Sequence, residues 1–299
     1  MRGSAALLAL AASGCGVAGP SVPLPTRHPV RVMSLNQCTD QIVLALLPRD
    51  RIASVTWLSR DPAGSIMVEK ARRVGVNHAL AEEVLAQKPD LIVAGAFTTP
   101  ALRALLTRLH YPMIEVDEAM NVDDIRRVTR KIAGAVDARA RGEALIADMD
   151  AKLAALARDP GPPIRVVAWD RTGFTAGEGS LYDAVLTAAG ARNLARAPMT
   201  LGYRRPGIEV LLKADPALLV QGSLERKAAS LGDDVLRHRL VRRYWGDRTI
   251  FMPQSYYACG TPMIADAAIR LRADLRAASA RIRRPAPVAA PLPAAPTLQ

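Results

Sequence analysis

The sequence has few aromatic side chains, which make up 4% of its 299 residues, and few cysteines, of which there are three. It has no CxxC pair and no Cys/His spacing of the zinc-binding kind, which excludes a structural zinc site of that type. No window offers the roughly 18–20 consecutive apolar residues that a spanning helix needs, which excludes a polytopic membrane protein. The GxSxG and HExxH motifs are absent, and the four histidines stand singly, without a carboxylate or Cys at ligand or triad spacing. We therefore expect no metal site, no cofactor and no catalytic activity.

The chain carries 40 basic against 28 acidic side chains, a net charge of +12, and most of the basic residues are Arg. These arginines are scattered over the whole length, whereas nucleic-acid binders usually gather their charge into a stripe or run. We therefore attribute the surplus to solvated helix faces and expect no nucleic-acid partner. An apolar share of 50% without a short repeat excludes collagen-like, coiled-coil and wholly disordered chains.

The amino terminus has the layout of a secretory signal peptide, with Arg2 before a short apolar stretch and small residues after it. Two cleavage interpretations are open. Small residues at Gly16 and Ala18 suit ordinary removal, whereas residues 12–15 (ASGC) resemble a bacterial lipobox and make Cys15 a candidate for lipidation. Both interpretations predict export to the periplasm, the second with a lipid anchor.

Export affects the two remaining cysteines, Cys38 and Cys259, because an oxidising compartment allows disulfides to persist. The two lie far apart in sequence, so pairing would require the fold to bring both ends of the chain together. Two separate buried thiols are the alternative. The residues alone leave both interpretations open.

Short apolar runs alternate with helical patterns in both halves of the chain, which predicts an α/β fold with parallel sheets covered on both faces. The expected strands are residues 31–35, 52–56, 91–95, 112–116, 164–169, 217–222 and 248–252. Helices are expected at 81–87, 100–109, 181–189 and 264–283, with Ser180 capping the third. A long helix with Asp137 as its expected cap separates the halves, and about 20 helical residues span roughly 30 Å.

The predicted organisation follows from these patterns. It comprises a signal peptide (1–18), a Pro-rich tether (19–29), an N-terminal α/β lobe (30–120), a helical segment with a bridging helix (121–160), a C-terminal α/β lobe (161–284) and a disordered Pro/Ala tail (285–299).

The loops that follow the expected strands hold most of the few aromatic side chains, together with several arginines. Ligands of open parallel sheets bind at such loops, beyond the carboxyl ends of the strands. The candidate ligand-binding residues are Trp57, Arg60, Phe97, Trp169, Arg171, Tyr203, Arg204, Tyr256 and Tyr257. Aromatic faces cover large planar or greasy ligands, and Arg binds anionic oxygens. The set predicts a cleft for a large, partly anionic ligand.

Several segments resemble the periplasmic substrate-binding proteins that deliver ferric siderophores, haem or cobalamin to bacterial ATP-driven importers. They are residues 32–62, which begin VMSLNQCTDQ, 80–95 (LAEEVLAQKPDLIVAG), 174–193 and 207–222 (GIEVLLKADPALLVQG). The resemblance implies two open parallel-sheet lobes that are bridged by one long α-helix and move little on ligand binding. It also implies a monomer that captures a metal chelate and docks on an ABC permease of the inner membrane.

The resemblance further implies roles for individual residues. One surface Glu on each lobe pairs with permease arginines in that family, and Glu82 and Glu209 hold the corresponding positions, each seven residues before a Pro. The neighbouring Glu83 is an alternative to Glu82. Cys38 and Cys259 fall in cleft loops of different lobes, so a disulfide between them is expected.

By the same comparison, Trp57, Phe97 and Tyr203 lie in loops that line the cleft, and Arg60 is the candidate for binding an anionic group. A ferric siderophore is the leading ligand because the cleft loops are rich in Arg. Cobalamin, which is large and nearly neutral, is the alternative that the aromatic residues suit. An exported enzyme on a two-lobe α/β fold is the alternative of a different class, and it predicts an acid–base or metal constellation in the cleft.

Overall fold

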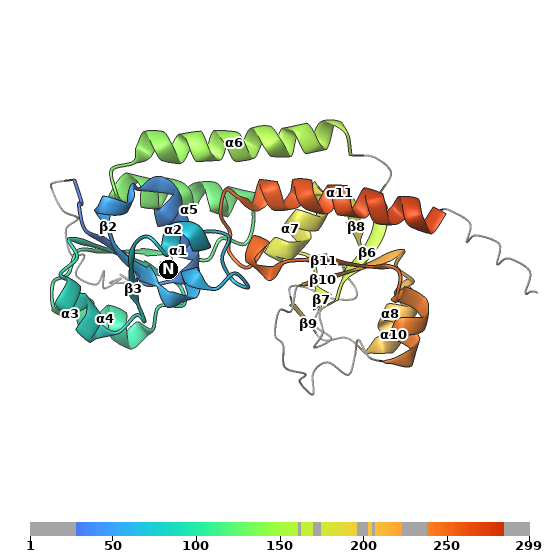
Figure 1. Cartoon of the computed structure of the whole chain (residues 1–299), viewed down its shortest axis with the longest axis horizontal. Coiled ribbons are helices and arrows are strands. Elements are labelled where there is room, and N and C mark those ends of the chain that lie inside the picture. Colours follow the sequence, from blue (N-terminus) through green and yellow to red (C-terminus); the bar gives the residue numbers. More distant parts are fainter. Residues whose placement is uncertain are drawn as a thin grey trace, which may run out of the picture.

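The computed structural model of the chain describes residues 28–160, 163–169, 175–195, 203–204, 207–222 and 238–283. The predicted signal peptide with Cys15, Arg171 and the C-terminal tail lie outside these ranges, as do the side chains of Tyr203 and Arg204. Within the described ranges the chain forms two α/β lobes, which lie side by side in Figure 1 under one long helix. No helix in these ranges has both the length and the hydropathy that crossing a membrane requires.

The N-terminal lobe is built on a five-stranded parallel sheet. Its strands are β1 (Val32–Ser34), β2 (Ile52–Thr56), β3 (Gly75–Asn77), β4 (Leu91–Gly95) and β5 (Met113–Val116), in the order β3-β2-β1-β4-β5. The strand β4 is buried along its whole length, as an apolar central strand with helices on both faces must be. The strand β3 adds to the expected set, because its short sequence, GVN, has no apolar run.

Helices cover both faces of this sheet. The helices α1 (Gln37–Leu46) and α5 (Val122–Ala135) pack on one face, and α3 (Ala81–Gln87) and α4 (Pro100–Arg108) pack on the other. The short α2 (Val68–Ala71) packs beside the 3-10 turn η2 (Trp57–Arg60), and a second such turn, η1 (Arg49–Arg51), precedes β2. Asn36 caps α1, because its Oδ1 accepts hydrogen bonds from the backbone N–H groups of Cys38 and Thr39. The cap fixes the point at which the chain turns from β1 into α1.

The C-terminal lobe repeats the three-layer plan around a four-stranded parallel sheet. Its strands β6 (Ile164–Ala168), β8 (Ala191–Asn193), β10 (Leu218–Gly222) and β11 (Thr249–Met252) lie in the order β11-β10-β6-β8. The helices α7 (Leu181–Ala188) and α11 (Ile264–Arg283) cover one face, and α8 (Ile208–Ala214) and α10 (Arg239–Trp245) cover the other. A short antiparallel pair, β7 (Thr175–Ala176) and β9 (Tyr203–Arg204), stands apart from this sheet. Ser180 caps α7, as expected, by accepting a hydrogen bond from the N–H of Asp183.

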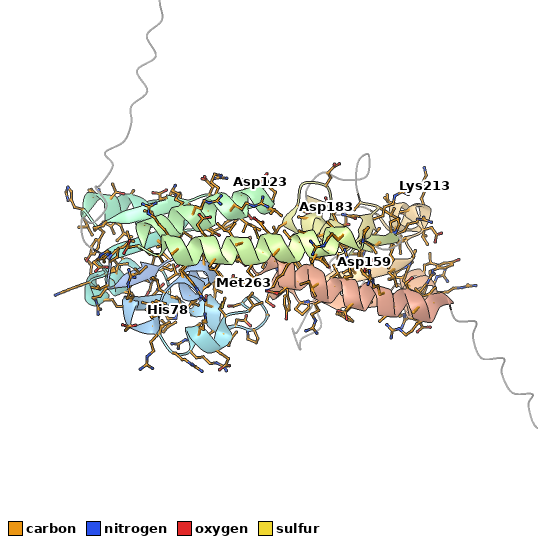
Figure 2. All side chains as sticks on the ribbon, turned by 90° about the horizontal axis from the view of Figure 1, so that it is seen from above. His78, Asp123, Asp159, Asp183, Lys213 and Met263 are labelled. Atoms are coloured by element: carbon orange, nitrogen blue, oxygen red, sulfur yellow. A yellow bond between two sulfur atoms is a disulfide. The ribbon has the colours of Figure 1, made fainter. Side chains whose placement is uncertain are left out.

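The bridging helix is α6 (Arg139–Arg158), which packs on α5 of the first lobe and on α11 of the second. In Figure 2, seen from above, α6 crosses both lobes and lies beside α11. Lys152 ties the two helices together, because its Nζ lies 2.7 Å from a carboxylate oxygen of Asp266. The expectation that Asp137 caps α6 is wrong by one position: Ala138 is the N-cap. Asp137 instead adopts a left-handed turn with φ of 50°, a conformation that Asp tolerates better than most residues.

Candidate ligand-binding site

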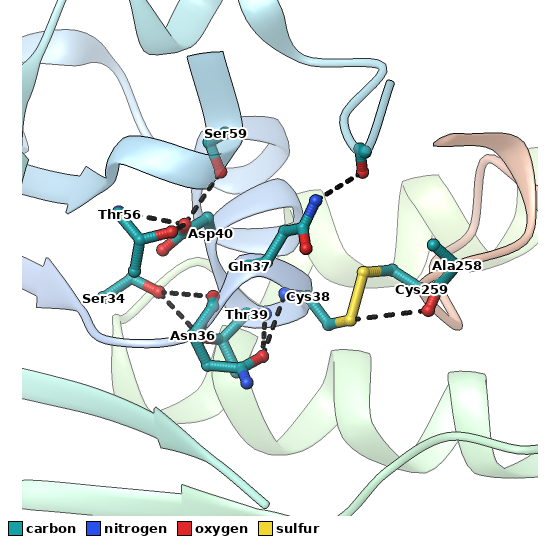
Figure 3. Close-up of a disulfide and its surroundings, with 11 residues drawn as sticks. Ser34, Asn36, Gln37, Cys38, Thr39, Asp40, Thr56, Ser59, Ala258 and Cys259 are labelled. Carbon is teal, nitrogen blue, oxygen red and sulfur yellow. Dashed lines mark hydrogen bonds between the residues drawn. A yellow bond between two sulfur atoms is a disulfide. The ribbon is translucent and has the colours of Figure 1, made fainter. Parts of the chain in front are cut away.

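The carboxyl ends of the two sheets meet at a disulfide between Cys38 and Cys259 (Figure 3). Cys38 lies in the first turn of α1, directly after β1, and Cys259 follows β11 and the 3-10 turn η4 (Gln254–Tyr256). Their Cα atoms are 5.0 Å apart although 221 positions separate the two residues in sequence. This is the pairing that the resemblance implies. The loops that carry ligands in open parallel sheets therefore face each other across the junction of the lobes.

A hollow of about 30 Å³ lies beside the disulfide and is lined by segments of both lobes. Its walls include Asn36, Phe97, Asp117 and Glu118 of the first lobe, together with Gly260 of the second. A Cβ atom at Gly260 would lie 2.4 Å from the carbonyl oxygen of Ala119, so only glycine allows the two segments to pack this closely. The hollow thus lies at the junction of the two lobes.

Two aromatic side chains are exposed along the same edge of the first sheet. Trp57, directly after β2, is 51% exposed, and Phe97, after β4, is 71% exposed. Large apolar side chains are normally buried, so two exposed rings beside one cleft indicate a surface for an apolar or planar partner. The structure therefore leaves both rings accessible to a ligand.

Asp40 holds the segment that carries Trp57. The carboxyl group is completely buried, and its Oδ2 accepts hydrogen bonds from Thr56 N at 3.0 Å, Thr56 Oγ1 at 2.5 Å and Ser59 Oγ at 2.7 Å. Burial raises the pKa of Asp40 to about 7, although hydrogen bonds from Ser34, Thr56 and Ser59 act in the opposite direction. Figure 3 shows this cluster beside the disulfide. Asp40 is not recognisable as a positioning residue from the sequence, because its partners Thr56 and Ser59 come from the next strand and turn.

His78 is a second residue whose partner the sequence does not indicate. It has no carboxylate at ligand or triad spacing, but its Nδ1 lies 2.9 Å from Oε1 of Glu83 in the folded chain. His28 contacts Asp137 in the same manner. The signal in the sequence is weak, because His78 and Glu83 are five positions apart and their contact depends on the turn between them.

Two predicted ligand residues have other roles in the structure. The Arg60 side chain donates hydrogen bonds to the carbonyl oxygens of Ala71, at 3.3 Å, and Val74, at 2.8 Å, which turns its guanidinium toward the segment between α2 and β3. Trp169 is 1% exposed and packs in the core with Leu211 and Trp245. It ends a buried strand, so its ring fills the layer between the sheet and α8 instead of facing a ligand.

Two of the predicted tyrosines of the second lobe, Tyr256 and Tyr257, lie at the carboxyl end of β11. Tyr257 stacks on Tyr182 with ring centroids 4.0 Å apart, and its hydroxyl approaches Gly222, where a Cβ would lie only 2.0 Å away. Tyr256 is half-buried, with the guanidinium of Arg270 at 5.9 Å from its ring centroid. Both rings are thus held in place at the sheet edge that faces the first lobe.

The helices α3 and α8 are equivalent elements of the two lobes. Each has seven residues and ends at a non-glycine residue in a left-handed conformation, Lys88 in α3 and Asp215 in α8. In each lobe an Arg side chain donates a 2.7 Å hydrogen bond to a carbonyl at the end of the helix, from Arg31 to Gln87 and from Arg165 to Ala214. Residues 80–95 and 207–222 both have a Glu seven residues before a Pro and an apolar run after it. This shared pattern reflects a local structure that is repeated in the two lobes.

Glu82 and Glu209 stand at the second position of α3 and α8 and are both exposed. The two helices lie on the same side of the molecule, below their sheets in Figure 1 and opposite α6. Glu83 is turned back instead, where it accepts hydrogen bonds from the N–H groups of His78 and Leu80. Of the two neighbouring glutamates, Glu82 is the one whose carboxylate is free to meet a partner.

Two α/β lobes joined by one long helix, with strand-end loops facing across a cleft, define a non-catalytic two-lobe solute-binding protein. The chain belongs to the periplasmic binding protein family, whose sequence pattern matches residues 32–244. Family membership implies a location outside the cytoplasm.

Individual relatives are distant. The chain is 28% identical over 230 residues to a cobalamin-binding protein of Halobacterium salinarum (strain R1), a match that covers 72% of this chain and 60% of that protein. The periplasmic haem-binding protein RhuT of Roseiflexus sp. RS-1 superposes with a TM-score of 0.69 at 22% identity, covering 84% of this chain and 99% of that one. The vitamin B12 binding protein BtuF of Vibrio cholerae gives a TM-score of 0.62 at 19% identity, covering 84% and 98%. These structures establish the shared fold.

Proposed function

We propose that the protein is the substrate-binding subunit of an ABC importer and that it captures a corrinoid of the cobalamin type. The observation that carries the proposal is the pair of exposed rings at the carboxyl edge of the first sheet: Phe97, which lines the hollow at the junction of the lobes, and Trp57, which follows β2. A corrinoid is a large ring system with broad apolar faces, which aromatic side chains cover well. The similarity to a protein named for cobalamin binding supports the same ligand.

The structure weakens the argument for a ferric siderophore, the ligand that the sequence favours first. That argument depends on arginines in the cleft loops, and the Arg60 guanidinium is bound to backbone carbonyl groups instead. The described wall of the hollow also contributes two carboxylates, Asp117 and Glu118, which disfavour an anionic chelate. Arg171 and Arg204 keep the iron chelate as the second candidate, because they are predicted from the sequence to lie in the cleft loops.

Titration of the full chain with cyanocobalamin and with several ferric siderophores, followed by tryptophan fluorescence, tests this proposal. We expect cyanocobalamin to bind at micromolar concentration or below and the siderophores not to compete. The variants Trp57→Ala and Phe97→Ala should each weaken cyanocobalamin binding by about tenfold or more, because each ring supplies contact area at the ligand surface. Tight binding of a ferric siderophore without any binding of cyanocobalamin would overturn the corrinoid assignment.

Delivery to the importer completes the proposed function. Glu82 and Glu209 are separated carboxylates on one side of the molecule, which suits them to fix the orientation of a permease with matching arginines. We infer export through the signal peptide at residues 1–18, with Cys15 as the candidate for a lipid anchor, and a monomeric protein. Intact-mass measurement of the protein isolated from a bacterial envelope distinguishes a cleaved amino terminus from a lipidated Cys15.

A further inference from the structure

His78, at the edge of the first sheet, has the hydrogen-bonding arrangement that is typical of a metal-binding histidine. In proteins, a metal-binding imidazole usually donates its second N–H to a carboxylate or carbonyl group, which fixes the ring and its tautomer. In this chain, Nδ1 of His78 lies 2.9 Å from Oε1 of Glu83. A carboxylate oxygen accepts hydrogen bonds, so Nδ1 is the nitrogen that donates to Glu83, and Nε2 is the ring nitrogen that Glu83 does not contact.

Glu83 itself is held in one position. Its Oε2 accepts hydrogen bonds from the backbone N–H groups of His78, at 2.6 Å, and Leu80, at 3.2 Å. Both carboxylate oxygens are therefore occupied by hydrogen bonds, and this corner of the lobe offers a metal a single nitrogen.

The backbone turn between His78 and Glu83 orients the imidazole ring of His78. Ala79 has φ of 57°, which is unusual for a residue with a side chain, and its N–H donates to Oδ1 of Asn77 at 3.1 Å. Asn77 is buried and anchored in turn, because its Nδ2 donates to Ser34 O and Ser54 Oγ. Backbone strain of this kind persists only where the surroundings enforce it, and it is common at functional sites.

His78 lies next to the aromatic surface proposed for the ligand. Thr56 at the end of β2 and Asn77 at the end of β3 are partners in the sheet register, so Trp57 and His78 leave the sheet side by side. Their ring centroids are 6.5 Å apart with an interplanar angle of 26°. The His78 side chain is 56% exposed, which leaves it accessible to a ligand that lies against Trp57. Figure 2 shows His78 on the N-terminal lobe, away from the bridging helix.

We propose that Nε2 of His78 binds the cobalt of the captured corrinoid at an exchangeable axial position. The macrocycle of a corrinoid already coordinates its cobalt, and one axial position remains exchangeable. A single protein nitrogen is therefore enough to complete the coordination of the metal. In the step, a cobalt–nitrogen bond forms and the cobalt–oxygen bond of an axial water breaks, with no change of oxidation state and no proton transferred. This inference rests on the proposed function, because it requires a corrinoid in the cleft.

The test compares aquocobalamin, whose axial water exchanges, with cyanocobalamin, whose cyanide blocks that position. We expect the wild-type chain to bind aquocobalamin at least about tenfold more tightly than cyanocobalamin and to change its visible absorption spectrum. His78→Gln should lose the spectral change and bind both corrinoids equally. His110→Gln, which alters another exposed histidine, should retain both the spectral change and the preference. Thermal unfolding of His78→Gln beside the wild type shows whether the variant is folded.

A second variant separates ligation from simple contact. Glu83→Gln leaves His78 in place but removes the charged acceptor of its N–H, so we expect aquocobalamin affinity to fall by about 10- to 100-fold while cyanocobalamin affinity stays the same. Equal binding of both corrinoids by the wild type without a spectral change would overturn the inference and leave the proposed function standing. A spectral change that persists in His78→Gln would also overturn it. Failure to bind either corrinoid would remove the proposed function and this inference together.

Discussion

The hydroxyl of Ser59 lies 2.7 Å from Oδ2 of Asp40, a carboxyl group with no exposed surface. Through this contact and those of Thr56, the first turn of one helix determines where the Trp57 segment runs. The neutral and the charged forms of Asp40 do not fit this environment equally, because burial disfavours the charge. The stability of the first lobe is therefore linked to pH.

Asp40 stabilises the folded protein more at low pH than at high pH. The pKa of Asp40 rises from 3.8 to about 7 on folding, so between these values the folded protein binds more protons than the unfolded chain. The contribution is fully present below about pH 4 and is lost as the pH rises to about 7, by roughly 1.4 kcal/mol per unit and about 4 kcal/mol in all. Asp40→Asn removes the group, so urea unfolding at pH 5 and pH 8 should show a smaller pH dependence in the variant. Identical pH dependence in both proteins would contradict the prediction.

The disulfide should contribute to stability through the unfolded chain. It closes a loop between residues 221 positions apart, and its loss frees that loop in the unfolded ensemble. We expect Cys38→Ser and Cys259→Ser each to lower the free energy of unfolding by about 2 to 5 kcal/mol. The double variant should resemble either single variant, since one bond is lost in every case. Dithiothreitol should destabilise the wild type and leave the double variant unchanged, and equal sensitivity of the two would argue against a bridging role.

The two exposed glutamates give a prediction about delivery. Reversing the charge with Glu82→Arg or Glu209→Arg should reduce permease-dependent uptake by about tenfold or more, because like charges then meet at the contact. Ligand affinity measured on the isolated protein should stay at the wild-type value. Glu69→Arg is the matched control, since Glu69 is exposed and lies on α2, away from both helices. Full uptake by the variant altered at both Glu82 and Glu209 would exclude this docking surface.

Replacing Gly142 or Gly134 by Ala should change the free energy of unfolding in opposite directions. A Cβ at Gly142 in α6 would lie 2.5 Å from the Cβ of Ala133 in α5, so Gly142→Ala should force these helices apart and cost about 1 to 3 kcal/mol. A Cβ at Gly134 would meet only the flexible end of Arg139, at 3.3 Å. Gly134→Ala should therefore stabilise the protein by about 0.5 to 1 kcal/mol through helix propensity. Thermal unfolding of the two variants beside the wild type measures both shifts, and a common sign would show that helix contact is not the cause.

The fold is largely predictable because its central strands and long helices have strong apolar patterns. The strand β4 reads as five apolar or small residues in a row, and the helix 264–283 is found with its expected bounds. The strand β3 is not predictable in this way, since it is fixed by pairing with β2 and by the buried amide of Asn77. Local sequence therefore predicts β4 and the helix at 264–283, whereas β3 depends on tertiary contacts.

The candidate site is predictable only in part, for the same reason. The position of Trp57 after a strand indicates its role, because any residue there lies at the carboxyl edge of the sheet. The orientation of a long side chain is not encoded in that position, as the hydrogen bonds of Arg60 to two carbonyl groups show. The pairing of His78 with Glu83 depends on the left-handed turn at Ala79, a conformation that the residue type does not indicate.

The bridging helix and the bond from Cys38 to Cys259 both join the lobes, one along the top of the molecule and the other at the sheet edges. The close packing of Gly260 on Ala119 adds a third contact beside the bond. The strand-end segments of the two lobes are therefore held in one arrangement before a ligand arrives. Binding then has a smaller entropic cost, because the protein groups that meet the ligand are already in place.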